Sequence, residues 1–143
     1  MENNISPTDI GNLSGLFVFT IDHSEFCINM QEVTGIIRTD DSFHPFKESD
    51  THIRYRGDEY RIIPLNRIYN LNYNTSDRSR VLLLNINDHL YSLLVDKVNE
   101  VIAVKDSRDK TMSFLPDKDP RLNGIINYNG QEIKYPNYSK LVE

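Results

Sequence analysis

Apolar residues along this chain come in short runs separated by turn-forming residues, a pattern typical of β-strands. The run LFVFTI at residues 16–21, the polar turn DHSE and FCIN at residues 26–29 predict a first hairpin. VLLLNI at residues 81–86 and LYSLLV at residues 90–95, on either side of NDH, predict a second. In residues 124–135 the pair NG lies between GIINY and QEIKY and predicts a third, because this dipeptide favours the tight turn of a hairpin.

The stretches between these hairpins also favour strands and loops. Residues 53–71 alternate around RGDE and predict a further hairpin that closes near Gly57. Pro64, near the end of its second strand, favours an edge strand or a strand terminus, because proline cannot donate to a sheet ladder. Residues 30–37 predict a helical turn that runs into a strand, and residues 38–52 predict a loop. No long amphipathic helix is predicted.

The stretch SLLVDKVNEVIAV, residues 92–104, fits two structures. Val95 and Val98 are spaced as on one face of a helix, whereas the density of β-branched residues favours strands. Asp96 is either an acid for chemistry or a bend residue whose carboxylate accepts hydrogen bonds from backbone N–H groups. We favour the bend, because carboxylate catalysis normally needs a second group and none is placed by spacing. We expect Val95 and Val98 to be core residues.

These patterns predict an all-β protein in two similar halves, built as a sandwich or as small barrels. The polar linker NYNTSDRSR at residues 72–80 divides the halves. Residues 1–13 are polar and are expected to be a flexible lead-in, followed by a single domain over residues 14–143. A chain of 143 residues is long enough to bury a core without disulfides.

Composition and charge argue against several classes of function. The net charge of −5 argues against a nucleic-acid partner, because phosphate binding needs a clustered basic surface. No apolar run predicts a signal peptide or a membrane span, and the single cysteine, Cys27, fits a reducing compartment, so a soluble cytoplasmic protein is expected. The four histidines are scattered and no glycine-rich phosphate loop exists. We therefore expect no catalytic residue, no metal site and no cofactor.

Four segments match the order of motifs in a known family. They are LFVFTIDHSEFCINMQEV, RIIPLNRI, RVLLLNINDHLYSLLVDKVNEVI and LNGIINYNGQEIKYPNYSKLV. In this order they resemble the CheW family of chemotaxis coupling proteins over about residues 16–142. The most specific match is LLVDKVNEVI, which contains Val95, Asp96 and Val98 and resembles the family pattern "llVDxVxeVl".

The resemblance implies a fold and a function. The fold would be two small five-stranded β-barrel subdomains with short helical turns and a groove between them. The first would cover roughly residues 16–71 and the second roughly residues 80–135, with chain ends able to cross between them. The function would be that of a non-catalytic cytoplasmic adaptor. Its partners would be the regulatory domain of a CheA-type histidine kinase and the cytoplasmic tip of a chemoreceptor, with no nucleic acid and no membrane insertion.

The partner-facing segments depart from the family pattern more than the cores do. Of the family segment "fi.GviNlRG", the stretch THIRYRGDEYRIIP keeps only Arg56 and Gly57. Arg67 occupies an acidic position of the family pattern, and Pro136 stands where a strand residue is expected. We take Arg56, Gly57 and Val33 as candidate partner-binding residues. For Gly57 an equally good explanation is the positive φ of a turn.

Three other functions are considered beside a chemotaxis adaptor. The chain could be a divergent CheW-like interaction module in a non-chemotactic signalling system. It could be a small barrel that binds a small ligand or a nucleic acid, which a deep apolar pocket with converging polar groups would support. An enzyme is the least supported class, since it would need a cleft with paired titratable groups.

Overall fold

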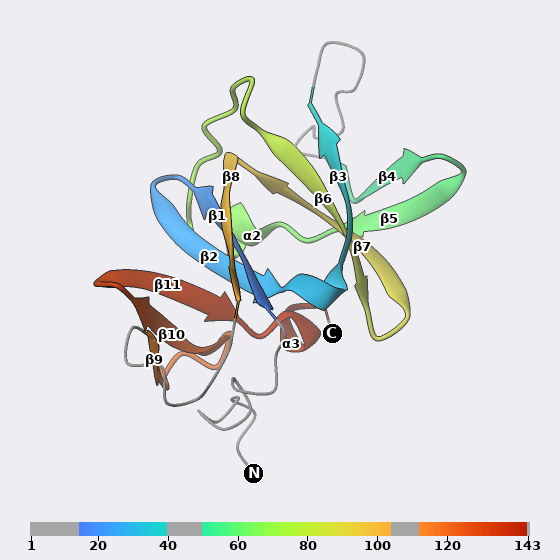
Figure 1. Cartoon of the computed structure of the whole chain (residues 1–143). Helices are drawn as coiled ribbons and strands as arrows, with labels where there is room; N and C mark the ends of the chain where they lie inside the picture. Colours follow the sequence, from blue (N-terminus) through green and yellow to red (C-terminus); the bar gives the residue numbers. More distant parts are fainter. Residues whose placement is uncertain (1–14, 40–49, 104–111, 143) are drawn as a thin grey trace.

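Two β-sheets make up most of the computed structural model, which describes residues 15–39, 50–103 and 112–142 (Figure 1). The predicted all-β fold class, with only short helices, is confirmed. The flexible segment expected at residues 1–13 and most of the loop expected at residues 38–52 lie outside the described residues.

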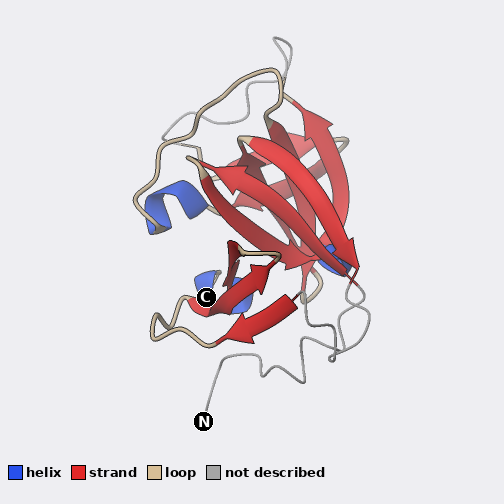
Figure 2. Cartoon of the chain, turned by 60° about the vertical axis from the view of Figure 1, so that its left-hand side comes forward, coloured by secondary structure: helices blue, strands red, loops and turns tan. Residues whose placement is uncertain are grey.

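We call the six-stranded sheet "sheet A" and the five-stranded sheet "sheet B". The strand order of sheet A is β8 (Lys97–Ala103), β1 (Gly15–Ile21), β2 (Ser24–Asn29), β11 (Gln131–Pro136), β10 (Leu122–Tyr128) and β9 (Met112–Leu115). The strand order of sheet B is β3 (Val33–Arg38), β6 (Arg80–Ile86), β7 (His89–Val95), β5 (Asp58–Ile62) and β4 (His52–Tyr55). The helical turns are η1 (Met30–Glu32), α2 (Leu65–Ile68) and α3 (Tyr138–Leu141). Figure 2 shows the strongly twisted sheets with the short helices at their ends.

All four predicted hairpins are confirmed: β1–β2, β4–β5, β6–β7 and β10–β11. Each turn has two central residues with positive φ, the geometry of the type I′ turn, whose twist matches that of the flanking strands. These pairs are Asp22–His23, Arg56–Gly57, Asn87–Asp88 and Asn129–Gly130. Turn chemistry is local, so these hairpins could be found from short stretches of sequence.

Two elements were not predicted. Strand β9, in the charged region after residue 104, pairs with β10 and gives sheet A a sixth strand, so the expectation of five strands in each sheet is wrong for sheet A. Its four residues are too few to show a clear alternation. Helix α2 directly follows Pro64. Because β5 lies between β7 and β4, Pro64 marks the terminus of a strand and not an edge strand.

Each sheet contains strands from both halves of the sequence. Sheet B joins β3, β4 and β5 from before the polar linker with β6 and β7 from after it. In sheet A, β8 pairs with β1, and β11 pairs in parallel with β2. Apolar patterns identify strands, but they do not say which strands pair, so a division at residues 72–80 did not predict this mixing.

Strands β1 and β6 each contain a continuous apolar run, LFVF in β1 and VLLL in β6, because both faces of these runs are buried. All seven residues of β1 are buried. The large hydrophobic core contains residues of both sheets, including Phe19, whose ring stacks on that of Phe26 at 5.9 Å. Along β6, Leu82 and Leu84 belong to this large core, whereas Val81 and Leu83 belong to a smaller core within sheet B. Continuous apolar runs are expected of strands that are covered on both sides.

Asp96 is the residue at which the chain leaves sheet B and enters sheet A. Its backbone N–H donates to the carbonyl oxygen of Thr20 at 2.9 Å. One carboxylate oxygen accepts from the backbone N–H of Asp22 at 2.7 Å, and the other from the backbone N–H of Asn74 at 2.9 Å. The ambiguous stretch 92–104 is therefore two strands on either side of a bend, over the residues that the structure describes.

Replacing Val95 by alanine should lower the free energy of unfolding by about 1–3 kcal/mol, because the substitution removes buried methyl groups and leaves a cavity. The Val95 side chain is fully buried, whereas Val98 is half-buried against the same core. Val98→Ala should therefore lower the free energy of unfolding by less than Val95→Ala. Urea denaturation measures the difference. Val101→Ala, on the same segment but 49% exposed, is the control and should change the midpoint little. Equal losses in Val95→Ala and Val101→Ala would contradict the assignment.

Replacing Asp96 by asparagine should lower the free energy of unfolding by about 2 kcal/mol. One of the two backbone donors, Asp22 N–H or Asn74 N–H, would then face an amide NH₂ instead of an oxygen. The measurement is again urea denaturation, with Asp88→Asn in the exposed β6–β7 turn as the matched control. If Asp96→Asn is as stable as the control, the carboxylate does not hold the bend.

Candidate functional site

The β4–β5 hairpin carries the candidate partner-binding pair at its tip. Arg56 and Gly57 are both exposed, with φ of 50° and 86°. The Arg56 guanidinium carbon lies 5.2 Å from the centre of the Tyr55 ring, a cation–π arrangement that keeps the side chain along the hairpin. A Cβ atom at Gly57 would meet no heavy atom within 4 Å, so the positive φ of the turn is what favours glycine there.

Val33 lies at the other edge of sheet B. It ends η1, begins β3 and pairs with Leu84 of β6. Its side chain is half-buried and packs against the large core. In the strand order, β6, β7 and β5 separate β3 from β4. The ladder therefore does not bring Val33 together with Arg56 and Gly57.

Two carboxylates meet beside the bend between the sheets. Asp22 accepts hydrogen bonds from the backbone N–H of Asn72 at 3.0 Å and from the side-chain amide of Asn74 at 3.3 Å. These bonds hold the pKa of Asp22 below its ordinary value. Asp96 receives two backbone N–H groups in the same place. Both carboxylates accept hydrogen bonds that fix backbone, which is a structural task and not an arrangement for proton transfer.

A first hollow, the cationic hollow, lies where β6 and β8 begin. It has a volume of about 240 Å³ and is lined by Arg78, Arg80, Lys97 and Val98. Val98 thus contributes both to the core and to this wall. The sequence analysis did not identify this site. Two signals were available: the RSR triplet that ends the polar linker, and the predicted hairpin of residues 81–95, whose pairing of Arg80 with Val95 brings the triplet close to Lys97.

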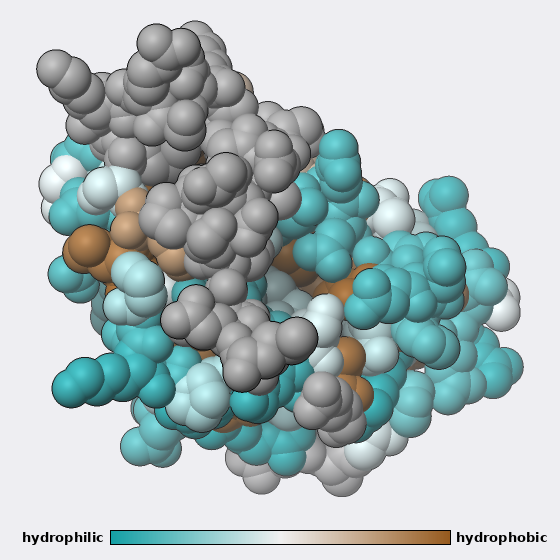
Figure 3. All heavy atoms as spheres, turned by 90° about the horizontal axis from the view of Figure 1, so that it is seen from below, coloured by the Kyte–Doolittle hydropathy of each residue, from teal (hydrophilic) through white to brown (hydrophobic). Residues whose placement is uncertain are grey.

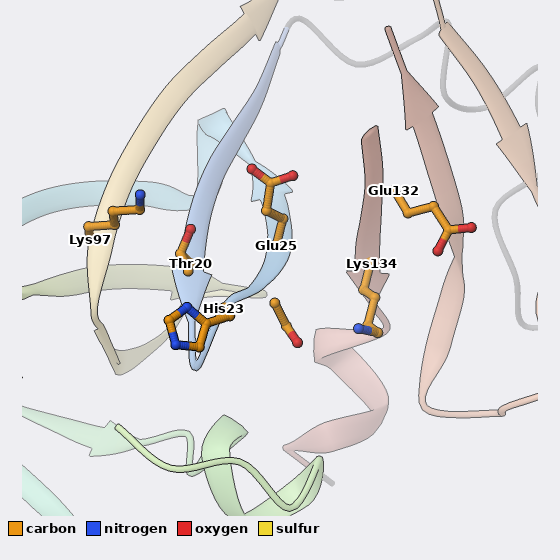
Figure 4. Close-up of a pocket in the computed structure, with 7 residues that line it drawn as sticks. Thr20, His23, Glu25, Lys97, Glu132 and Lys134 are labelled. Carbon is orange, nitrogen blue, oxygen red and sulfur yellow. The ribbon is translucent and has the colours of Figure 1, made fainter. Parts of the chain in front are cut away.

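A second hollow, the mixed-charge hollow, has a volume of about 410 Å³ (Figure 4). Its side chains come from the β1–β2 hairpin, β8 and β11. Two of its lining residues are joined through a residue outside the lining: the Asn99 side chain accepts from the Thr20 hydroxyl and donates to the Glu25 carboxylate, each at 3.0 Å. Lysine, histidine and glutamate side chains all line this hollow, so it favours neither sign of charge. The lining residues are Thr20, His23, Ser24, Glu25, Lys97, Glu132 and Lys134.

The groups that could carry covalent or metal chemistry are placed as structural residues. Cys27 is fully buried, and burial raises the pKa of its thiol, which disfavours the reactive thiolate. Its carbonyl oxygen accepts from the buried Tyr138 hydroxyl at 2.8 Å. Among residues 15–39, 50–103 and 112–142, no group of three or more His, Cys, Asp or Glu side chains is placed to hold a metal ion.

The described residues on the face shown in Figure 3 are mostly polar. On the face shown in Figure 3, apolar side chains form small patches between polar ones, apart from the grey atoms. The described residues include four exposed large hydrophobic side chains: Met30, Ile36, Val101 and Leu115. Three of these belong to edge strands, β3, β8 and β9. The unpaired N–H and C=O groups of an edge strand can pair with another chain, whereas single exposed apolar residues are normal on a protein surface.

The described part of the chain contains no helix long and apolar enough to cross a membrane. No curated protein matches the sequence. Among solved structures, the chain is similar to the crystal structure of the scaffolding protein TtCheW from Thermoanaerobacter tengcongensis, with a TM-score of 0.71 and 20% sequence identity. The match covers 92% of this chain and 88% of that one. The profile of the CheW-like domain matches residues 15–143, which is nearly the whole chain. The chain therefore belongs to the family of CheW-like domains.

Proposed function

We propose that this protein is a non-catalytic adaptor that couples chemoreceptors to a CheA-type histidine kinase. Membership of the CheW-like family along residues 15–143 is the observation that carries the proposal. The fold similarity to a scaffolding protein agrees with it. An adaptor needs surfaces for two partners and no reactive side chain, and the polar groups described above serve the fold.

Open sheet edges are the surfaces best suited to this role. Within the described residues, β8 and β9 are the edges of sheet A, and β3 and β4 are the edges of sheet B. A specific interface buries about 800 Å² on each partner, roughly a tenth of the 8641 Å² that this chain exposes. Two partners can thus bind different edges at once, which is the geometric requirement for coupling a receptor to a kinase.

Arg56 is the strongest of the three candidate receptor-side residues. It is exposed at a hairpin tip, and arginine is favoured at the energetic centres of interfaces because its planar guanidinium makes paired hydrogen bonds. Gly57 contributes the shape of the turn, and Val33 is half-buried against the core. A receptor contact therefore depends first on Arg56.

The departures from the family pattern favour a different kinase or receptor as the partner, while the adaptor role stays the same. Arg67, at a position that is acidic in the family pattern, is exposed on α2. Pro136 is the last residue of β11 and is buried, so that departure does not lie on the surface. A change at an exposed position such as Arg67 can alter partner choice and leave the core intact, so a kinase or receptor of a non-chemotactic system would use the same fold.

Replacing Arg56 by glutamate should weaken co-assembly with the receptor tip or the kinase about tenfold or more, the effect of removing an interface hot spot. The thermal midpoint should stay within about a degree of the parent protein, because the side chain is exposed. The measurement is a quantitative pull-down with the CheA-type kinase and the receptor cytoplasmic fragment from the same genome.

Lys118→Glu is the control for this experiment, because Lys118 is exposed outside the hairpin and the charge change is the same. Equal binding by both variants would remove Arg56 from the interface. Absence of binding by the unmodified protein to both kinase and receptor would overturn the proposed coupling itself.

A further inference from the structure

The cationic hollow gathers positive charge in a protein whose net charge is −5. Three of its four lining residues, Arg78, Arg80 and Lys97, are cations, and no carboxylate-bearing residue lines it. The register of β3 and β6 places Arg38 directly opposite Arg80, which adds a fourth cation on the same face of sheet B. Like charges directly opposite in a sheet are destabilising, so a bound anion would relieve this arrangement.

The surrounding backbone holds Arg80 in place. Its Nη1 atom donates to the carbonyl oxygens of Asp77 and Ser79, both at 2.8 Å. Within the described residues, its Nη2 and Nε atoms have no recorded hydrogen bond. An arginine that is already oriented loses less conformational entropy when it binds a ligand.

The turn before β6 is closed by its own hydrogen bonds and positions Arg78. Ser76 N–H donates to the Ser79 hydroxyl at 2.9 Å, and Ser79 N–H donates to the Ser76 carbonyl oxygen at 3.1 Å. The Arg78 N–H donates to the Ser76 hydroxyl at 3.1 Å. The Ser79 residue is fully buried, so the turn is anchored in the protein.

No ion pair neutralises these cations within the described residues. The recorded pairs involve other residues: His52 and Arg54 with Glu59, and Arg121 with Asp119. Asp96 precedes Lys97 in the chain, but both of its oxygens accept backbone N–H groups. The positive charge of the hollow is therefore available to a ligand.

The size of the hollow limits what it can hold. Drug-sized ligands occupy pockets of about 300–1,000 Å³, whereas this hollow has about 240 Å³. It suits a single small group of high negative charge. Guanidinium groups match phosphate oxygens through paired, charge-assisted hydrogen bonds. Val98 supplies an apolar wall, so the hollow offers a ligand an apolar contact beside the three cations.

We propose that the cationic hollow binds a small ligand carrying phosphate-type oxyanions, held by Arg78, Arg80 and Lys97. The site is distinct from the candidate receptor-side residues and does not depend on the adaptor function. Lys97 belongs to sheet A and Arg80 to sheet B, so one ligand bridges the two sheets. Binding to the folded state raises the thermal midpoint, and above Kd the stabilisation grows with the logarithm of the ligand concentration.

Isothermal titration calorimetry of the unmodified protein tests the site with three probes: inorganic phosphate, pyrophosphate and glycerol phosphate. Sodium chloride at the same ionic strength is the reference for general screening. We expect saturable binding with a stoichiometry of one, and a rise in thermal midpoint that chloride does not reproduce. The comparison of free phosphate with the phosphate ester distinguishes a free anion from a phosphorylated small molecule.

Charge-reversal variants locate the binding. Arg78→Glu, which alters only the cationic hollow, and Lys97→Glu, which alters both hollows, should each weaken binding about tenfold or more, whereas Lys118→Glu should weaken it less than twofold. Amide chemical-shift mapping on the unmodified protein gives the same location without a variant. Shifts should concentrate at Arg78, Arg80, Lys97 and Val98.

Four outcomes would overturn the proposal. One is that chloride at equal ionic strength gives the same midpoint shift as phosphate and pyrophosphate. Another is that Lys118→Glu weakens binding as much as Arg78→Glu. A third is that the shifted amides lie elsewhere. The fourth is that all three phosphate probes fail to bind, and binding of an acidic peptide at this hollow would then assign the surface to a protein partner.

Discussion

The carboxylate of Asp96 is the constraint on which the arrangement of the two sheets depends. A single bend residue receives backbone N–H groups from the β1–β2 turn and from the polar linker, and its own N–H binds Thr20 of β1. Buried polar groups are costly unless they are satisfied, and here the carboxylate and its donors satisfy one another. Strand β7 can therefore end in sheet B and β8 can begin in sheet A without leaving the backbone unpaired.

Around this bend, the core joins the two sheets into one body. Strand β1 is buried on both faces, and β6 contributes to both cores. Polar groups inside or near the bend serve the backbone, whereas three of the four exposed large hydrophobic residues among those described lie on the sheet edges. This division leaves the edges of both sheets open on the surface of the described structure.

The sequence predicted hairpins and turns, which depend on residues close together in the chain. It did not predict features that depend on contacts between distant segments. Four hairpins followed from turn residues and flanking strands, and the LLVDKVNEVI motif pointed to the CheW family. The pairing of strands that are distant in the sequence, the six-stranded sheet and β9 did not follow, because apolar runs do not specify their partners. The cationic hollow was missed as well: Arg78 and Arg80 lie in one segment and Lys97 in another, and the β6–β7 hairpin, which pairs Arg80 with Val95, together with the bend at Asp96 brings them close to one another.

The hydrogen bond from the Tyr138 hydroxyl to the Cys27 carbonyl joins residues that are 111 positions apart. Strand β11, which pairs with β2, lies just before Tyr138 in the chain. A ribosome adds roughly 5–20 residues per second, so on the order of 5–20 s separate the synthesis of these two residues. During that time β2 has one edge without its native partner. The acidic net charge makes nascent chains repel one another. This repulsion disfavours pairing of the open β2 edge with another chain before β11 is synthesised.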